Sequence, residues 1–395
     1  MLYTATLCML AAGSVMVYSA SSAEALLQGP GDPAYYLKRY VACGLIGLVV
    51  MNLLSRHGLR VVKAATPMLL IGSFVLTLAV MLPGAGVSAN GATRWLAAGP
   101  LQFQPSELLK LALVLYAAQL LAARPRATRT VGGLMKPLLL VVGAGCALLM
   151  VQPDMGTTLV ICFAIFSLLL AAGTPVRVLG TILGTVILLA LIVALLEPYR
   201  RARLTSFVNP FHDAGGAGFQ AVQALTAVGS GGLFGVGLGE SVQKIFYLPE
   251  AHTDMILAII GEELGLFGLF GVIALYGMLG YAGLRTAKLA KDRYSKLLAA
   301  GVTSLVLSQA SLNFFAVLGM APLTGVPLPF ISYGSTNLIV MMGGMGLLLN
   351  VAATGGRAAT RSRPRLQAIE GGRGGEDRDR RRRDGGSRRA GARGR

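Results

Sequence analysis

The sequence predicts an all-α, polytopic integral membrane protein with about ten transmembrane helices, long extracytoplasmic loops and a disordered basic C-terminal tail. Of its 395 residues, 54% are apolar and only 13% are charged, and the mean hydropathy is +0.66. Soluble domains average about 25% charged residues, so this composition excludes an ordinary soluble domain. Apolar runs of about 20 residues, which can cross a bilayer as helices, recur along the chain.

Hydropathy predicts ten spans, which together form a membrane domain over residues 1–353. They cover residues 2–20, 38–54, 64–82, 105–122, 137–152, 156–172, 177–196, 254–276, 297–318 and 335–353. Pro153 and Gly156 in "QPDMG" predict a tight turn between the fifth and sixth spans. A signal peptide is the alternative for the first span, but no basic segment precedes its apolar residues.

Loop charges predict the orientation, because Lys and Arg gather on the cytoplasmic side of membrane proteins. This rule places both termini in the cytoplasm, and between the first span and the tail only Asp292 is then an acid in an inner loop. The acids at or near the outer face are Glu24, Asp32, Glu107, Asp154, Glu197, Asp213, Glu240, Glu250 and Asp254. Polar chemistry is therefore expected at the extracytoplasmic surface of the cell membrane.

The net charge of +18 could indicate nucleic-acid binding, but many of the basic residues fall in the Arg- and Gly-rich segment 354–395. Runs such as "DRDRRRRDGG" cannot form a core, so this segment is expected to be a disordered cytoplasmic tail. It suits attraction to anionic lipid or to an acidic partner, or it is merely solvated. Nucleic acid is not an expected partner.

Two outer loops are long, and long loops inside compact proteins are usually functional. One runs from Pro83 to Gln104 and the other from about residue 197 to 253. The second contains "FQAVQALTAV", an amphipathic stretch that suits the membrane interface, and the Gly-rich "GSGGLFGVGLGESVQK". These glycines do not indicate a nucleotide loop, because no strand precedes them and no βαβ unit follows.

Ionisable side chains at membrane depth cost at least ~2.5 kcal/mol each and are functional candidates. The stretch "QPSELLK" begins at Gln104 and follows Arg94 in the chain. Within it, Glu107 and Lys110 share a helix face and are predicted to pair. This pair indicates either a polar functional site or a purely structural ion pair. Arg94 suits bidentate phosphate recognition, with snorkelling as the alternative. Asp154, beside a glycine, indicates turn chemistry.

The stretch "YLPEAHTDMILAIIGEE" places acids at the start of an apolar helix and inside it. A helix is predicted to begin near Asp254, with His252 or Thr253 as its cap. Because Glu250 and His252 lie within a few residues of Asp254, this end of the helix is expected to form a polar mouth.

Two further acids, Glu262 and Glu263, continue the same helix. At 1.5 Å per residue, Glu263 lies about 13 Å deeper than Asp254 and faces the opposite way. These acids therefore cannot share one pocket with Asp254, and they are expected to pair with Lys110, Arg94 or backbone groups.

The segment "PLPFISYGSTN" is predicted to form an outer turn that enters the last span. Pro329 and Gly334 can interrupt a helix there and expose backbone groups to a cavity. The segment is predicted either to contact the substrate, for example through Ser332, or simply to interrupt the helix.

Five stretches occur in a fixed order: "GSVMVYSAS", "GATRWL…QPSELLKLAL", "QPDMGTTLV", "YLPEAHTDMILAIIGEELG" and "PLTGVPLPFISYGST". Together they resemble the SEDS family (shape, elongation, division and sporulation) of bacterial cell-wall membrane proteins, over nearly the whole chain to about residue 353. "SVQKIFYLPEAHTD" is more similar to the division member than to the rod-shape member. "HTDM" departs from the family's "HTDF", a volume-tolerant apolar swap.

The resemblance implies a peptidoglycan glycosyltransferase that polymerises lipid II outside the cytoplasmic membrane, at the division septum. It also implies a class B penicillin-binding protein, a transpeptidase, as partner, along with other membrane proteins of the division machinery. The family's essential Asp corresponds to Asp254. Its polar cavity corresponds to Arg94, Gln104, Glu107, Lys110 and Glu263, beside Glu250, His252 and Ser332 in the same motifs.

The implied reaction joins two lipid-linked disaccharides and releases undecaprenyl pyrophosphate. Pyrophosphate needs charge stabilisation rather than protonation, so one carboxylate base, Asp254, and the cations Arg94 and Lys110 would suffice. A divalent cation, Mg²⁺ or Mn²⁺, is a further expectation, although the sequence holds no dedicated metal motif. The alternatives are a lipid II flippase and a non-enzymatic scaffold that activates the transpeptidase.

Overall fold

The computed structural model describes residues 1–29, 31–82, 86–89, 92–98, 101–196, 206–216 and 218–361. Residues 1–356 form one compact unit and residues 357–395 form a second. The predicted tail, 354–395, lies from residue 362 onward outside the described residues, so its disorder stays a prediction.

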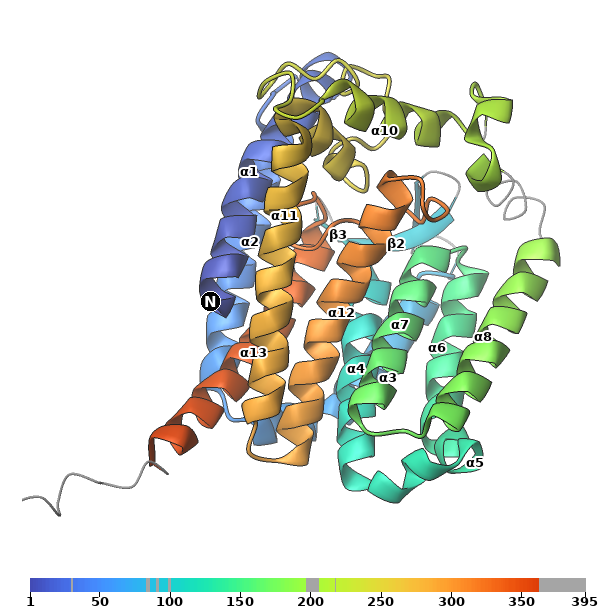
Figure 1. Cartoon of the computed structure of the whole chain (residues 1–395), viewed down its shortest axis with the longest axis vertical. Helices are drawn as coiled ribbons and strands as arrows, with labels where there is room; N and C mark the ends of the chain where they lie inside the picture. Colours follow the sequence, from blue (N-terminus) through green and yellow to red (C-terminus); the bar gives the residue numbers. More distant parts are fainter. Residues whose placement is uncertain are drawn as a thin grey trace, which may run out of the picture. The chain divides into compact units, whose positions relative to one another are not determined.

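In the described residues, eight helices are long and apolar enough to cross a membrane, and two shorter apolar helices occupy the positions of the sixth and seventh predicted spans (Figure 1). They are α1 Leu2–Leu27, α2 Tyr35–Arg56, α3 Leu59–Ala79, α4 Pro105–Ala123, α5 to α6 Val131–Val151, α7 Met155–Ala171, α8 Val176–Leu196, α11 Ile256–Leu289, α12 Arg293–Val317 and α13 Ser335–Arg361. The fifth span joins α5 Val131–Leu134 to α6 Leu140–Val151 through a π-helical turn, Met135–Leu139. Many apolar side chains on the outside of the bundle, such as Ile71, Leu188 and Phe270, are exposed, as lipid contact requires.

Several helices extend beyond their predicted spans. The helix α1 ends at Leu27 instead of residue 20, and α11 continues to Leu289 instead of residue 276. Hydropathy marks only the apolar part of a helix, whereas its hydrogen bonding continues through polar residues such as Glu24 and Arg285. The chain is an integral membrane protein with longer helices than the apolar runs alone indicate.

The helices alternate in direction, so the ends of α1, α3 and α6 meet the starts of α4, α7 and α11 at one end of the bundle (Figure 1). This end, here called the site end, carries the small sheet, Asp254 and α10 Phe219–Ser230, which lies across it. The helix α2 ends and α3 begins at the opposite end of the bundle. That the site end faces out of the cell stays a prediction.

The predicted long loop from Pro83 to Gln104 contains a three-stranded antiparallel sheet, which the sequence analysis did not predict. Its strands, in the order β1-β2-β3, are β1 Gly86–Ala89, β2 Ala92–Ala98 and β3 Leu101–Phe103. Cα partners include Val87 with Trp95 and Leu96 with Phe103. The dipeptide Asn90-Gly91 between β1 and β2 is a hairpin signal that the hydropathy analysis passed over.

The central helix of the bundle is α12, which packs against α4, α7 and α11. Its buried polar residues Gln309 and Asn313 lie one turn apart near the site end. By contrast, α8 lies at the edge of the bundle, where it packs against α7 and α5 (Figure 1). Buried polar groups on a central membrane helix need partners, and these partners define the site.

Candidate functional site

Two side-chain amides on α12 hold the site together. Gln309 Nε2 donates to the carbonyl of Pro327 at 2.8 Å, and Asn313 Nδ2 donates to the carbonyl of Val326 at 2.9 Å. Asn313 Nδ2 also donates to the backbone carbonyl of Asp254 at 2.7 Å. These bonds join α12, the segment before α11 and residues 324–333, here called the proline loop.

The predicted pair between Glu107 and Lys110 is confirmed. Lys110 Nζ lies 2.9 Å from Glu107 Oε2 and donates to Gln309 Oε1 at 2.7 Å, with both charged side chains buried. Gln309 and Asn313 are four residues apart, about 6 Å along the helix. Lys110 and Asp254 therefore contact α12 one turn apart, although Lys110 is enclosed by protein partners instead of facing open solvent.

The proline loop is fixed by hydroxyl groups as well as by amides. Tyr276 of α11 donates to the carbonyl of Pro329, and Tyr40 of α2 donates to that of Phe330. Ser332 Oγ accepts a bond from the Leu328 amide at 2.8 Å, and the Ser332 side chain is buried. Ser332 is therefore part of the turn itself, as helix interruption requires, and its contact with substrate stays a prediction.

The carboxylate of Asp254 lies against the proline loop. A methyl group on Gly325 would lie 3.9 Å from Asp254 Oδ2, and Thr253 Oγ1 donates to Asp254 Oδ1 at 3.2 Å. The helix α11 begins at Ile256, close to its predicted start, but the predicted cap at His252 or Thr253 is wrong, because no side chain among the described residues caps it. Asp254 therefore lies in the preceding turn, at 8% relative exposure, where Asn313 holds its backbone carbonyl.

His252 is held in an aromatic and ionic setting beside Asp254. Its Nδ1 lies 3.2 Å from Glu24 Oε2, and its ring contacts those of Tyr36 and Tyr333 with centroids 4.4 and 5.6 Å away. The Tyr333 amide donates to the His252 carbonyl at 3.0 Å. Glu250 is exposed, has a positive φ of 56° and accepts a bond from the Thr253 hydroxyl. His252 is thus buried and fixed by these contacts, and its part in substrate binding stays a prediction.

Arg94 and Gln104 hold neighbouring segments of the site end. Arg94, on β2, donates to the carbonyls of Gln152, at 3.2 Å, and Pro153. It thereby braces the turn before α7, where Asp154 Oδ1 accepts a bond from Thr157, the turn chemistry that was predicted. The backbone amide of Gln104 donates to Thr336 Oγ1 at 3.1 Å, joining the start of α4 to α13.

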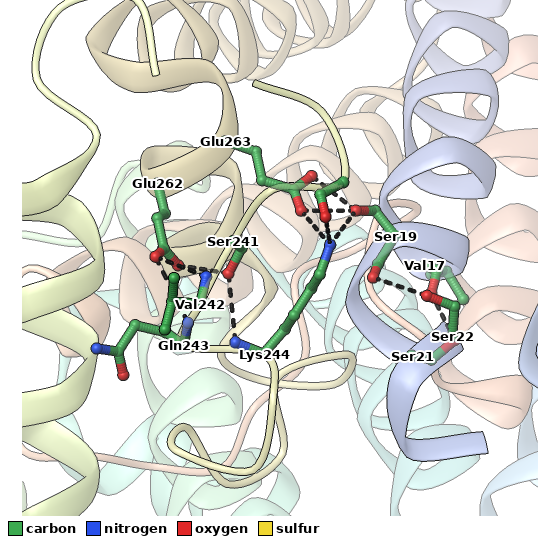
Figure 2. A network of polar contacts seen from close by, with 11 residues as sticks. Val17, Ser19, Ser21, Ser22, Ser241, Val242, Gln243, Lys244, Glu262 and Glu263 are labelled. Atoms are coloured by element: carbon green, nitrogen blue, oxygen red, sulfur yellow. Dashed lines mark hydrogen bonds and ion pairs between the residues drawn. The ribbon is translucent and has the colours of Figure 1, made fainter. Parts of the chain in front are cut away.

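Of the partners predicted for Glu262 and Glu263, backbone groups are confirmed for Glu262, whereas neither acid pairs with Lys110 or Arg94. Glu263 pairs with Lys244 Nζ at 2.8 Å, and Glu262 accepts bonds from Ser241 and from backbone amides (Figure 2). Sequence analysis passed over Lys244 because it lies in a loop, where a lysine is usually solvated. The Glu263 carboxylate is thus bound by protein groups, and its contact with substrate stays a prediction.

No three of the described Asp, Glu, His and Cys side chains come together as metal ligands. The described residues therefore do not fit a dedicated Mg²⁺ or Mn²⁺ site. A divalent cation shared between carboxylates and the substrate's diphosphate stays a prediction, and no step is assigned to a metal ion.

The comparisons with known proteins agree with this architecture. The family model of the FtsW, RodA and SpoVE proteins, described as cell cycle proteins, matches residues 1–355. A probable peptidoglycan glycosyltransferase FtsW of Thioalkalivibrio sulfidiphilus is 40% identical over 373 residues, covering 93% of this chain and 92% of the relative. The stage V sporulation protein E of Bacillus subtilis is 36% identical, covering 88% of this chain and 94% of the relative.

Solved structures resemble the same chain. A chain of a peptidoglycan synthase complex that coordinates polymerization and crosslinking matches with a TM-score of 0.73 and 31% identity, over 90% of this chain and 97% of that one. The rod shape determining protein RodA of Thermus thermophilus matches with a TM-score of 0.63 and 28% identity, over 89% of this chain and 95% of its own. On this evidence the chain belongs to the FtsW/RodA/SpoVE family, which is the SEDS family that its motifs resemble.

Proposed function

We propose that Asp254 is the general base with which this chain, a peptidoglycan glycosyltransferase, polymerises lipid II. The 4-hydroxyl of one sugar loses its proton to the Asp254 carboxylate as its oxygen attacks the anomeric carbon of a second lipid-linked disaccharide. The bond from that carbon to the diphosphate breaks, and undecaprenyl pyrophosphate leaves with the electron pair.

One observation carries the proposal: Gln309 and Asn313, one turn apart on α12, bind Lys110 and the Asp254 backbone. The backbone of Asp254 and the ammonium of Lys110, 144 residues apart in sequence, are thereby fixed at one end of the bundle (254 − 110 = 144). Buried polar networks of this kind are expensive in a membrane and mark functional sites.

The chemistry needs one base and positive charge, because pyrophosphate leaves without protonation. Arg94 is the cation proposed for the diphosphate, since it is partly exposed and its backbone carbonyl bonds leave its charge unneutralised by any carboxylate in the described residues. Lys110, neutralised by Glu107, supports the site from inside instead of contacting the substrate.

The proposed partner is a class B penicillin-binding protein, which would cross-link the strands that this chain makes. Support comes from the solved relative that is part of a complex coordinating polymerization and crosslinking. The proposed location is the division septum, because the relatives include several division proteins named FtsW. The site end is proposed to lie outside the cell and both termini in the cytoplasm, because Lys and Arg gather in the predicted inner loops.

The decisive experiment reconstitutes the purified chain with its transpeptidase and supplies lipid II in the presence and absence of penicillin. A glycosyltransferase yields long glycan strands, and penicillin blocks only their cross-linking. A flippase would move labelled lipid II across vesicles without product, and a scaffold would do neither. Loss of lipid II without polymer, or no reaction by a folded complex, would overturn the proposal.

A further inference from the structure

Lys244 lies in the long loop before α11 and is buried in a cage of partners (Figure 2). Its Nζ lies 2.8 Å from Glu263 Oε1, 2.6 Å from the carbonyl of Gly239 and 3.2 Å from Ser19 Oγ. Ser19 Oγ, on α1, donates to the Glu263 carboxylate, whose two oxygens lie 2.6 and 2.7 Å away. One ion pair thus joins the loop, α1 and α11.

The neighbouring acid, Glu262, binds the same loop. Its carboxylate accepts a bond from the Ser241 hydroxyl and from the Val242 amide at 3.1 Å. The Ser241 hydroxyl also accepts the amide of Lys244 at 3.2 Å, so the two acids grip one short turn, 241–244. Here Lys244 and Glu263, with Glu262 beside them, are called the clasp.

A break in α11 allows the loop to reach this depth. Gly265 has φ 65° and interrupts the helix, so its neighbours bond to the loop: the Val236 amide donates to the Glu262 carbonyl at 2.9 Å and the Leu266 amide to the Gly232 carbonyl at 3.0 Å. A Cβ on Gly265 would lie 2.4 Å from the backbone nitrogen of Gly235, so only glycine allows this approach.

The clasp closes a ring of chain whose far point is Asp254. Lys244 and Glu263 are 19 residues apart, and Asp254 lies ten residues after the first (254 − 244) and nine before the second (263 − 254). The far point is pinned separately, by Asn313 at the Asp254 carbonyl and by Tyr333 at the His252 carbonyl. We propose that Lys244 and Glu263 are positioning residues that hold Asp254 in its reactive place, an inference that rests on the proposed function.

The helix α1 contacts both the clasp and the segment next to Asp254. Ser19 contacts the clasp, and Glu24, five residues further along α1, pairs with His252 at 3.2 Å. The outer part of α1 therefore braces the base of the ring and the neighbourhood of its far point. Displacing α1 would disturb both contacts together.

Stability alone does not explain the clasp. A buried ion pair is often no more stabilising than apolar residues of the same size, although removing one partner leaves a costly unpaired charge. Removing both charges should therefore restore stability, while the geometry that the pair imposes is lost. This difference separates a positioning role from a purely structural one.

The test compares wild type, K244M, E263Q, the neutral double variant K244M/E263Q and K244R, each purified as the full chain with its transpeptidase. Unfolding, the rate at saturating lipid II, the KM for lipid II and hydrogen–deuterium exchange of residues 239–255 are measured. Lys38→Met, which removes a lysine from an exposed pair with Asp32, is the matched control.

The double variant is expected to unfold like wild type yet to lose about tenfold or more in kcat, with KM within about twofold, because small misplacements of catalytic groups are costly. Residues 239–255 should exchange faster in it, and K244R should keep most of the activity. Wild-type kcat in the stable double variant overturns the positioning role of the clasp, whatever the hydrogen–deuterium exchange of residues 239–255. If wild type itself makes no glycan, the proposed function fails, and unchanged exchange in the double variant would separately refute the clasp.

Discussion

Replacing Asn313 by leucine tests the link between α12 and the base. The Asn313 amide donates to the carbonyls of Asp254 and Val326 at 2.7 and 2.9 Å, and leucine has similar volume but no donor. Each buried carbonyl left without a donor costs about 1–3 kcal/mol, so the variant should lose about 2–6 kcal/mol of unfolding free energy. The turn carrying Asp254 should also move.

The assay measures both consequences. Because misplacement of a catalytic group by about 1 Å can cost about 10²-fold, kcat for lipid II polymerisation should fall about 10- to 100-fold with little change in KM. The control is Thr303→Val on the same helix, which removes a hydroxyl bonded only within the helix, to Ala299. Wild-type kcat in Asn313→Leu, despite its lower stability, would refute the view that Asn313 positions Asp254.

Three further substitutions probe the surrounding structure. Lys110→Met should lower the unfolding free energy by about 3–5 kcal/mol by leaving Glu107 unpaired, and adding Glu107→Gln should recover most of it; additive losses in this cycle would contradict the pairing. Gly265→Ala should strain α11 and expose the loop to protease, and wild-type resistance would argue against the break. Arg94→Met should raise the KM for lipid II at least about tenfold, and an unchanged KM would remove Arg94 as the diphosphate partner.

Much of the membrane fold follows from apolar runs and loop charges, because water–lipid partition is read directly from composition. The sheet β1–β3 was not predicted, because its short strands carry no net hydropathy signal. The hairpin dipeptide Asn90-Gly91 was the available clue. The break at Gly265 escaped for another reason. A glycine in an apolar helix is usually tolerated, and only the loop that fills the break explains it.

The site was predictable where charge was visible. Glu107 and Lys110 share a helix face and do pair, and Asp254 does lie with polar partners at the site end. Gln309 and Asn313 were missed because uncharged amides within an apolar helix carry little signal, although their spacing of four residues was a clue. The partner of Glu263, Lys244, depends on a loop folding back over 19 residues, which no local pattern specifies.

The most direct test of the central claim compares wild type with Asp254→Asn in lipid II polymerisation, both purified in complex with the transpeptidase. Asparagine keeps the size and the backbone bond to Asn313 but cannot accept the sugar proton. The variant should fold, bind its partner and bind lipid II, yet lose at least about 10²-fold in glycan synthesis. Glycan chains growing at the wild-type rate would show that some other group takes the proton.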